Sequence, residues 1–146
     1  MRYTKKIIAA GRQGSWRAQE VLAYYAAQEF PEFVWQRSED QVVHSICESI
    51  RSVDRLELVA STDSGYQVGI MVLAEDEDMH VGRCLSVQWQ YVLPEYRNAG
   101  IAHRFMRTAI QLARQEGYPV LAYSHRVGPG EYSIKYRRIS GACARR

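Results

Sequence analysis

The segment around Gly100 has the composition of a backbone anion-binding site. The small residues Ala99 and Ala102 flank Gly100, and Arg97 precedes it by three positions. Helical periodicity begins here, and the first N–H groups of a helix have no partner within the helix. These groups and the positive end of the helix dipole attract anions, which small side chains let approach closely. The sequence therefore predicts a pyrophosphate cradle, although a glycine at this place can also serve only as a tight turn.

The elements that must position this segment can be predicted from hydrophobic periodicity. We expect a strand over Arg83–Val92, a helix over Gly100–Glu116 and a strand over Val120–Val127. This strand–helix–strand order implies that the two strands are parallel neighbours. In the first strand, alternation places the apolar side chains on one face; they are Leu85, Val87, Trp89 and Tyr91.

The N-terminal third of the chain predicts a short strand and two helices. The strand covers Ile7–Ala10, and a first helix runs from a Ser15 cap to about Phe30. A second helix opens with Ser38 and Gln41, which can form a capping box. The large apolar residues of the first helix fall near one face; they are Val21, Leu22, Tyr25 and Phe30.

Strand patterns fill most of the remaining chain. From Arg55 the period changes to two, and a second strand over Tyr66–Ala74 completes a hairpin. The acidic run Glu75–Asp78 is expected to be a solvated loop. Near the C-terminus, Gly128–Gly130 predicts a turn that leads into a last strand over Tyr132–Ile139.

The composition favours one globular domain over residues 1–146, ending in a basic tail over residues 139–146. With 47% hydrophobic and 24% charged residues in 146, the chain can bury a core and is not of a disordered class. Cys47, Cys84 and Cys143 are odd in number and lack zinc-ligand spacing, so we expect free thiols and no metal.

Charge and hydropathy limit the partners and the location. The longest apolar runs are far too short to cross a bilayer, so we expect a cytoplasmic protein without membrane contact. The net charge of +3 suits an anionic ligand. Nucleic acid is an unlikely partner, because only the tail concentrates arginines and no interleaved aromatic residues accompany them.

The segment Pro94–Ala102 resembles the central acetyl-CoA-binding motif of the GNAT family of N-acetyltransferases, Arg/Gln-x-x-Gly-x-Gly/Ala. The preceding strand ends in the pattern Val-x-Pro, and the following helix carries Phe105, Met106 and Leu112 at core spacing. The resemblance covers residues 55–127 and the order of the elements. It implies an α/β (α+β) GNAT fold, in which helices cover both faces of a mixed twisted sheet. Two central parallel strands of that sheet splay apart at the acetyl-CoA site.

The same resemblance implies a cofactor site. The pantetheine arm of acetyl-CoA, the expected co-substrate, would lie between the splayed strands and pair with the backbone of Tyr91 and Val92. The pyrophosphate would lie on the cradle, whose residues are Arg97, Asn98, Ala99, Gly100, Ile101, Ala102 and His103. Family members transfer acetyl directly to an amine, and a backbone N–H of the first parallel strand holds the developing oxyanion.

An amine must lose its proton before it attacks a thioester, so a positioned base assists the reaction. Family members often place a glutamate near the first parallel strand, where this chain has Gln88 and Gln90. Neither glutamine accepts a proton, although both can orient a substrate or a water. His125, near the end of the next strand, is the candidate base, since histidine titrates near neutral pH. It can equally be a structural strand residue or a phosphate contact.

The candidate general acid is Tyr132. Many family members carry a tyrosine on a helix after the second parallel strand, placed to protonate the leaving thiolate. This chain has a tight hairpin there, and Tyr132 and Tyr136 lie on its last strand. An aromatic residue on an edge strand can also serve packing alone.

Two functions follow from the sequence. The first is acetyl-CoA-dependent N-acetylation of an amine on a small molecule or a protein. The alternative is a non-catalytic GNAT-like binding or assembly protein. The hairpin and basic tail resemble those of acetyltransferase-like proteins of tailed bacteriophages. Such a protein would be a component of the virion or a host-takeover protein, located in the virion or in the host cytoplasm. Its partner would be a second copy of the chain or a virion protein.

Overall fold

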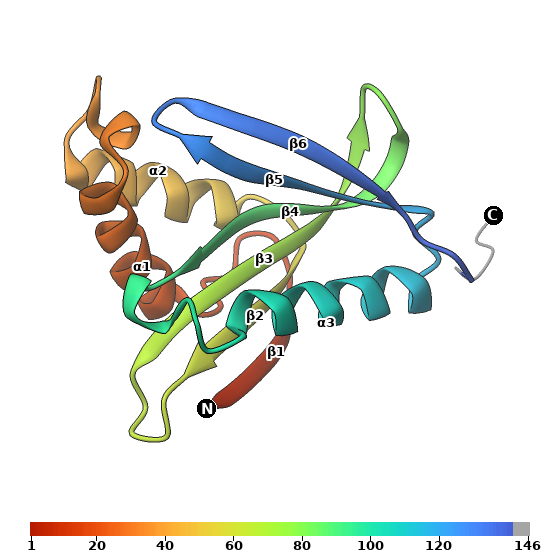
Figure 1. Ribbon diagram of the computed structural model, residues 1–146, viewed down its shortest axis with the longest axis horizontal. Coiled ribbons are helices and arrows are strands. Elements are labelled where there is room, and N and C mark those ends of the chain that lie inside the picture. Colours follow the sequence, from red (N-terminus) through yellow and green to blue (C-terminus); the bar gives the residue numbers. More distant parts are fainter. Residues whose placement is uncertain (142–146) are drawn as a thin grey trace.

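The strands of the sheet follow one another in space in the order in which they occur in the sequence. The computed structural model describes residues 1–141 (Figure 1). The strands are β1 (Arg2–Ile8), β2 (Arg55–Ser61), β3 (Gln67–Asp78), β4 (Gly82–Val92), β5 (Val120–Gly128) and β6 (Glu131–Arg138). The helices are α1 (Trp16–Glu29), α2 (Glu39–Arg51) and α3 (Ile101–Gln115), with short 3-10 turns η1 (Pro31–Val34) and η2 (Pro94–Tyr96).

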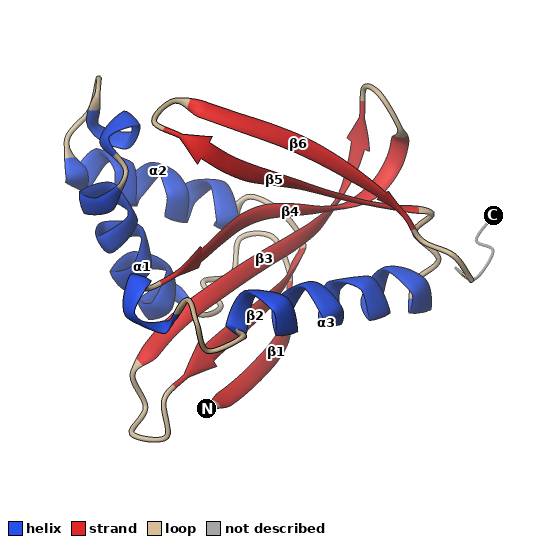
Figure 2. Cartoon of the chain, in the orientation of Figure 1, coloured by secondary structure: helices blue, strands red, loops and turns tan. Residues whose placement is uncertain are grey.

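Helices cover both faces of this sheet (Figure 2). One apolar cluster lies between the sheet and α3 and includes Phe105 and Leu121. A second lies between the sheet and the pair α1 and α2, and includes Leu22 and Ile70. All neighbouring strands are antiparallel except β4 and β5, which are parallel. The predicted mixed α/β fold with a central parallel pair is therefore confirmed.

The helix starts show one confirmed cap and one different arrangement. Ser38 Oγ accepts a hydrogen bond from the Gln41 N–H at 3.2 Å, and Gln41 Oε1 accepts one from the Ser38 N–H at 2.8 Å. This is the expected capping box. Ser15 does precede α1, but its side chain makes no capping bond. Its backbone N–H instead donates to Glu57 Oε1 at 2.6 Å.

The buried face of α1 differs from the prediction. Leu22 is buried as expected, but Val21 and Tyr25 are 41% and 45% exposed. The buried stripe consists mainly of alanines; its members are Ala18, Gln19, Leu22, Ala23, Ala26 and Ala27. Because alanine is short, the helix packs closely against its neighbours and its larger apolar side chains lie on the outer face.

A β-bulge in β4 overturns the predicted single apolar face of that strand. Val87 pairs with Leu73 and Trp89 pairs with Val72, so Gln88 has no partner on β3. The extra residue reverses the alternation. Leu85 and Val87 pack with the α3 cluster, whereas Trp89 and Tyr91 pack with the cluster under α1 and α2.

The acidic run Glu75–Asp78 is part of β3, so the predicted solvated loop is wrong. Its backbone pairs with β4 up to Asp78 and Gly82. Glu75, Asp76 and Glu77 are exposed, which explains their polar character. Asp78 accepts hydrogen bonds from the backbone N–H groups of His80 and Val81, at 2.7 and 3.2 Å, and so closes the turn.

The start of α3 lies in close contact with β3 at Gly69. A Cβ atom on Gly69 would lie 3.1 Å from Ile101 Cγ2 and 3.4 Å from both Phe105 and Val92. The contact with Ile101 is tighter than ordinary van der Waals packing, so any larger residue here would require the start of α3 to shift by a few tenths of an ångström. This contact fixes where the first turn of α3 lies relative to the end of β4.

A buried charged pair connects β2 with the loop before α1. Arg55 Nε donates to Glu57 Oε2 at 2.6 Å, and both side chains are fully buried. Gln19 Nε2 donates to the same carboxylate oxygen at 2.9 Å. Glu57 thereby satisfies donors from three segments and holds the entry to α1 on the sheet.

The end of the described chain remains attached to the domain. Ile139, which the sequence analysis assigns to the basic tail, is 8% exposed, and its N–H donates to the Pro119 carbonyl at 2.9 Å. The Ser140 carbonyl accepts a hydrogen bond from Arg114 Nε at 2.9 Å. Cys47 and Cys84 are free and buried as expected. Cys143, Arg145 and Arg146 lie outside the described residues.

Replacing Glu57 by Gln should lower the free energy of unfolding by about 3 kcal/mol, because it leaves the buried Arg55 charge without a counter-ion. Urea denaturation measures the change. Glu48→Gln is the matched control, since Glu48 forms an exposed ion pair with Arg51 at 3.3 Å. The control substitution should lower the free energy of unfolding by less than about 1 kcal/mol. Equal losses for the two variants would contradict the proposed importance of the buried pair.

Candidate functional site

The parallel strands β4 and β5 separate soon after they begin. They pair only at Leu85 with Leu121 and at Ser86 with Ala122. Within the described chain, the part of β4 beyond Ser86 has no partner on β5, although it stays paired with β3. Figure 1 shows β5 and β6 leaving the sheet together as an arm that extends toward the end of α1. The resulting gap corresponds to the splay that the sequence resemblance implies.

The predicted anion cradle lies at the end of β4, where η2 leads into α3. Gly100 caps the helix with a φ of 78°, in the left-handed region that glycine adopts readily. The first intrahelical bond runs from the Arg104 N–H to the Gly100 carbonyl at 3.0 Å. The preceding N–H groups, those of Ile101, Ala102 and His103, therefore have no acceptor within the helix.

The surroundings of these N–H groups fit an anion. Gly100, Ala102 and His103 are exposed, and a Cβ atom on Gly100 would meet nothing within 4 Å. The first turn of α3 contains no acidic residue that would repel an anion. The free N–H groups and the helix dipole together provide what a pyrophosphate requires.

Arg97 lies beside the cradle, but its guanidinium is already engaged. It donates to both carboxylate oxygens of Glu29 at 2.6 Å, and its Nε donates to the Val92 carbonyl at 3.0 Å. Tyr91 donates its hydroxyl to the same carboxylate at 2.7 Å. The hydrogen bond from Arg97 holds the pKa of Glu29 below its ordinary value. Arg97 thus anchors the loop after β4 to the end of α1.

A second cluster of the same composition anchors β5 and β6. Arg126 donates to the two carboxylate oxygens of Glu32 at 2.7 and 2.9 Å, and the Tyr132 hydroxyl donates to Oε2 at 2.6 Å. The bond from Arg126 lowers the pKa of Glu32 to about 2. Burial, then the bond to Glu32, raises the pKa of Tyr132 and keeps its phenol protonated at neutral pH. We call the three residues the Glu32 clamp.

A cavity of about 170 Å³ opens between the separated strands, on the face that α1 covers. Aromatic and uncharged polar side chains form most of its wall. Its lining residues are Phe30, Phe33, Val87, Gln88, Trp89, Gln90, Ser124, Arg126 and Tyr132. The cavity therefore brings together the end of α1, the bulge of β4 and both strands of the arm.

The structure places the two predicted catalytic residues on different sides. Tyr132 lines the cavity. Leu121 and Tyr123 pack with the α3 cluster, so alternation directs His125 to that face, whereas Ser124 lines the cavity. The roles of Tyr132 and His125 remain predictions, but only Tyr132 contacts the space between the strands on the α1 face.

Sequence reasoning missed the residues that hold the gap open. Glu29 and Glu32 flank Phe30 at the end of α1, and their arginine partners are 68 and 94 residues away in the chain. Two glutamates three positions apart around the end of a helix were the available signal. The signal became meaningful only when the fold brought Arg97 to Glu29 and Arg126 to Glu32, with the Arg126 guanidinium 4.5 Å from the centre of the Phe30 ring.

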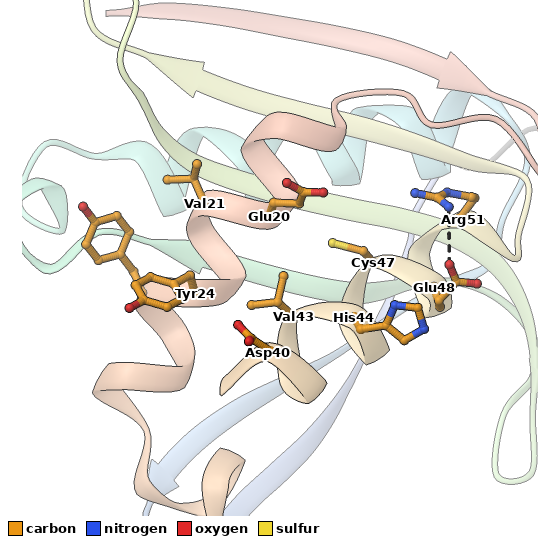
Figure 3. Close-up of a pocket in the computed structure, with 10 residues that line it drawn as sticks. Glu20, Val21, Tyr24, Asp40, Val43, His44, Cys47, Glu48 and Arg51 are labelled. Atoms are coloured by element: carbon orange, nitrogen blue, oxygen red, sulfur yellow. Dashed lines mark hydrogen bonds and ion pairs between the residues drawn. The ribbon is translucent and has the colours of Figure 1, made fainter. Parts of the chain in front are cut away.

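A more voluminous hollow lies elsewhere, between the outer faces of α1 and α2 (Figure 3). It measures about 750 Å³ and contains the carboxylates of Glu20, Asp40 and Glu48. Its single arginine, Arg51, is paired with Glu48. This excess of negative charge opposes the binding of a polyphosphate, so the hollow is a poor candidate for the acetyl-CoA site.

Two further features bear on the site. Among residues 1–141, no group of three or more side chains has the composition and proximity of a metal site. None of the helices in the same range is long and apolar enough to cross a membrane.

The sequence model of the acetyltransferase (GNAT) family matches residues 20–139. This match spans most of the chain and contains β4, the cradle and the arm, so the protein belongs to the acetyltransferase (GNAT) family. No curated protein sequence gives a significant match.

Solved structures of other acetyltransferases share the fold. A putative acetyl transferase from Pyrococcus furiosus superposes with a TM-score of 0.66 and 14% identity, covering 86% of this chain and 84% of that one. An aminoglycoside antibiotic 6'-N-acetyltransferase from Acinetobacter baumannii has a TM-score of 0.58 and 18% identity, and the match covers 86% of this chain and 81% of that one. A ribosomal-protein-alanine N-acetyltransferase from Brucella melitensis has a TM-score of 0.55 and 18% identity, and the match covers 87% of this chain and 82% of that one.

The Glu32 clamp should make stability depend on pH in a defined window. Because the pKa of Glu32 is about 2 in the folded protein and ordinarily 4.5, its contribution is complete above about pH 4.5. It declines as the pH falls from there toward 2. The free energies of unfolding of the wild type and of Glu32→Gln, measured with urea, should differ most at pH 6, differ less at pH 3 and converge only near pH 2.

Glu131→Gln, at an exposed position on the same hairpin, is the control. Its unfolding midpoint should stay near that of the wild type throughout the titration. If the free energies of unfolding of wild type and Glu32→Gln differed by the same amount from pH 6 to pH 3, this result would contradict the ionic basis of the clamp.

Proposed function

We propose that the protein is an acetyl-CoA-dependent N-acetyltransferase that moves acetyl directly to an amine of a small molecule or protein. The observation that carries the proposal is the position of the gap: β4 leaves β5 beside the exposed N–H groups that begin α3. A chain that only needed a stable sheet would gain more from continued pairing of the two strands.

The cofactor site follows from the same arrangement. The pyrophosphate of acetyl-CoA would lie on the N–H groups of Ile101, Ala102 and His103, and its pantetheine arm would lie along β4 near Tyr91 and Val92. The part of β4 facing the gap has no partner on β5, which leaves backbone groups for this pairing. A similar structure, an aminoglycoside N-acetyltransferase with a TM-score of 0.58 and 14% identity, is a complex with CoA.

Acetyl-CoA supplies an acetyl group activated as a thioester. The bulge at Gln88 interrupts the ladder of β4 and can direct a backbone N–H toward the carbonyl oxygen, where negative charge develops. The side chains of Gln88 and Gln90 orient the amine or a water that accepts its proton. A C–N bond forms while the C–S bond breaks; the amine loses one proton and the departing sulfur gains one.

Tyr132 is our candidate for the proton that reaches the sulfur. Its phenol lines the cavity and stays protonated because of its raised pKa. Alternation directs His125 to the α3 face, so an amine in the cavity would lose its proton to water held by the glutamines. His125 stays the base that the sequence predicts for an amine approaching from the α3 face. Glu32 is a poor base, because Arg126 holds its pKa near 2.

The two cysteines in the described part of the chain, Cys47 and Cys84, favour direct transfer over an acyl-cysteine route through either of them. Burial and the nearby Glu20 raise the pKa of Cys47 to about 11, and burial raises that of Cys84. A thiol becomes a good nucleophile only as the thiolate, so neither residue is suited to accept acetyl at neutral pH. Neither residue lines the cavity between the strands.

The cofactor site can be tested at Ala102, an exposed position in the first turn of α3. Ala102→Glu should weaken acetyl-CoA binding by about 100-fold, measured by calorimetry. The new charge would lie near the pyrophosphate, where two like charges about 4 Å apart repel by up to ~4 kcal/mol. A glutamate in the first turn also interacts favourably with the helix dipole, so the fold should be retained.

Ala102→Gln is the matched control, since it adds the same bulk without charge and should weaken binding by less than about 10-fold. Gly100→Glu is a less clean test, because its φ of 78° strains any other residue. Unchanged affinity in a folded Ala102→Glu protein would show that acetyl-CoA binds elsewhere or not at all. Release of CoA with a panel of amines then tests catalysis; binding without release would indicate a non-catalytic module.

Tyr132→Phe should lower kcat by ~100-fold while leaving acetyl-CoA affinity within about twofold, if Tyr132 donates the proton. The wild-type rate should rise with pH as the amine or its base loses a proton. His125→Ala is the companion variant. A similar loss of kcat, together with loss of the rise in rate with pH, would assign proton removal to His125. A Tyr132→Phe protein with wild-type turnover would exclude the phenol as the acid.

A further inference from the structure

The cavity between β4 and β5 has an unusually aromatic wall. Phe30 and Phe33 come from the end of α1 and from η1, with ring centroids 5.3 Å apart in an edge-to-face arrangement. Trp89 follows the bulge and stacks on Tyr91 at 6.5 Å. Tyr132 closes the wall from the arm. Four aromatic rings from three separate segments therefore surround one small space.

The charged groups beside this space are already paired. Arg126 is the only charged residue in the lining, and it binds both oxygens of Glu32. The next carboxylate, Glu29, is bound by Arg97 and Tyr91. Within the described chain, the cavity thus offers an ammonium group no carboxylate that is free of an arginine. A ligand with several positive charges would be desolvated here without receiving counter-ions.

The size of the cavity points the same way. It measures about 170 Å³, and a cavity of about 150 Å³ in another protein is known to hold benzene. One aromatic ring with a short arm would therefore fill it, whereas a molecule of several sugar rings would not. Gln88, Gln90 and Ser124 provide neutral hydrogen-bonding groups at the wall, which can orient a single amine.

We propose that the acceptor is a small primary amine carried on an aromatic ring by a short alkyl arm, and not a polycation. This inference rests on the proposed acetyltransferase function. The aromatic part would pack among Phe30, Phe33 and Trp89 on the α1 face. The amine would point toward Gln88 and the thioester, which approaches from the start of α3. The proposed acceptor thus carries one amine and a large apolar surface, whereas an aminoglycoside carries several amines and no aromatic ring.

The first test compares three amines at equal concentration with the acetyl-CoA-loaded protein: phenethylamine, spermidine and kanamycin. We expect kcat/KM for CoA release with phenethylamine to exceed that with either polycation by at least about 10-fold. A preference for spermidine or kanamycin would overturn the inference while leaving the acetyltransferase function standing.

A second test measures phenethylamine binding directly by ligand-observed NMR, which needs neither acetyl-CoA nor turnover. Phe33→Ala should weaken this binding by about 10-fold, because it removes one wall of the cavity. Phe33→Leu, which keeps the volume but not the ring, should have a smaller effect and guards against misfolding of the alanine variant. Val34→Ala is the matched control, since Val34 lies on the same turn, 38% exposed, and does not line the cavity.

The two proposals fail differently. Absence of acetyl-CoA binding in calorimetry would overturn the proposed function, whatever the amine result. Phenethylamine that does not bind, or that binds with equal strength to wild type and to both Phe33 variants, would overturn the acceptor inference alone. Binding that depends on Phe33 but not on Val34 would support it, even if turnover required a different arm on the ring.

Discussion

The separation of β4 from β5 after two paired residues is the constraint on which the rest of the site depends. Leaving backbone groups unpaired costs free energy, so other contacts must hold the strands apart. Two bidentate carboxylate–arginine pairs, Glu29 with Arg97 and Glu32 with Arg126, provide these contacts from the end of α1 and from η1. The end of α1 and η1 therefore act as a brace across the gap, which also explains why β5 and β6 leave the sheet together.

The sequence was most informative where structure depends on neighbours along the chain, although the face of α1 and the acidic end of β3 were predicted wrongly. The capping box at Ser38, the apolar stripe of α3 and the parallel pair around it were all predictable from local patterns. The bulge at Gln88 was not, because one inserted residue leaves the composition of β4 unchanged while reversing its faces. The ion pairs of Glu29 and Glu32 span 68 and 94 residues, and only the completed fold determines which arginines they meet.

The bulge and the two ion pairs together separate the part of the proposed site that would hold the cofactor from the part that would hold the acceptor. Before Gln88, β4 directs its apolar side chains toward α3; after it, Trp89 and Tyr91 face α1. The cofactor and the acceptor can thus approach the same strand from opposite faces, each meeting a different chemical surface. Similar structures at 14–18% identity share this fold, so the fold by itself does not define the acceptor.

The contact at Gly69 bears on how an anion would bind. Ile101 and Phe105 rest so close to β3 that a methyl group on Gly69 would lie 3.1 Å from Ile101 Cγ2 and 3.4 Å from Phe105. The N–H groups at the start of α3 are therefore fixed in direction before any ligand arrives. A ligand that meets such a preorganised backbone loses little of its binding free energy to ordering the protein. Van der Waals packing on the far side of the helix thus supports the affinity that the N–H groups and the helix dipole provide on the near side.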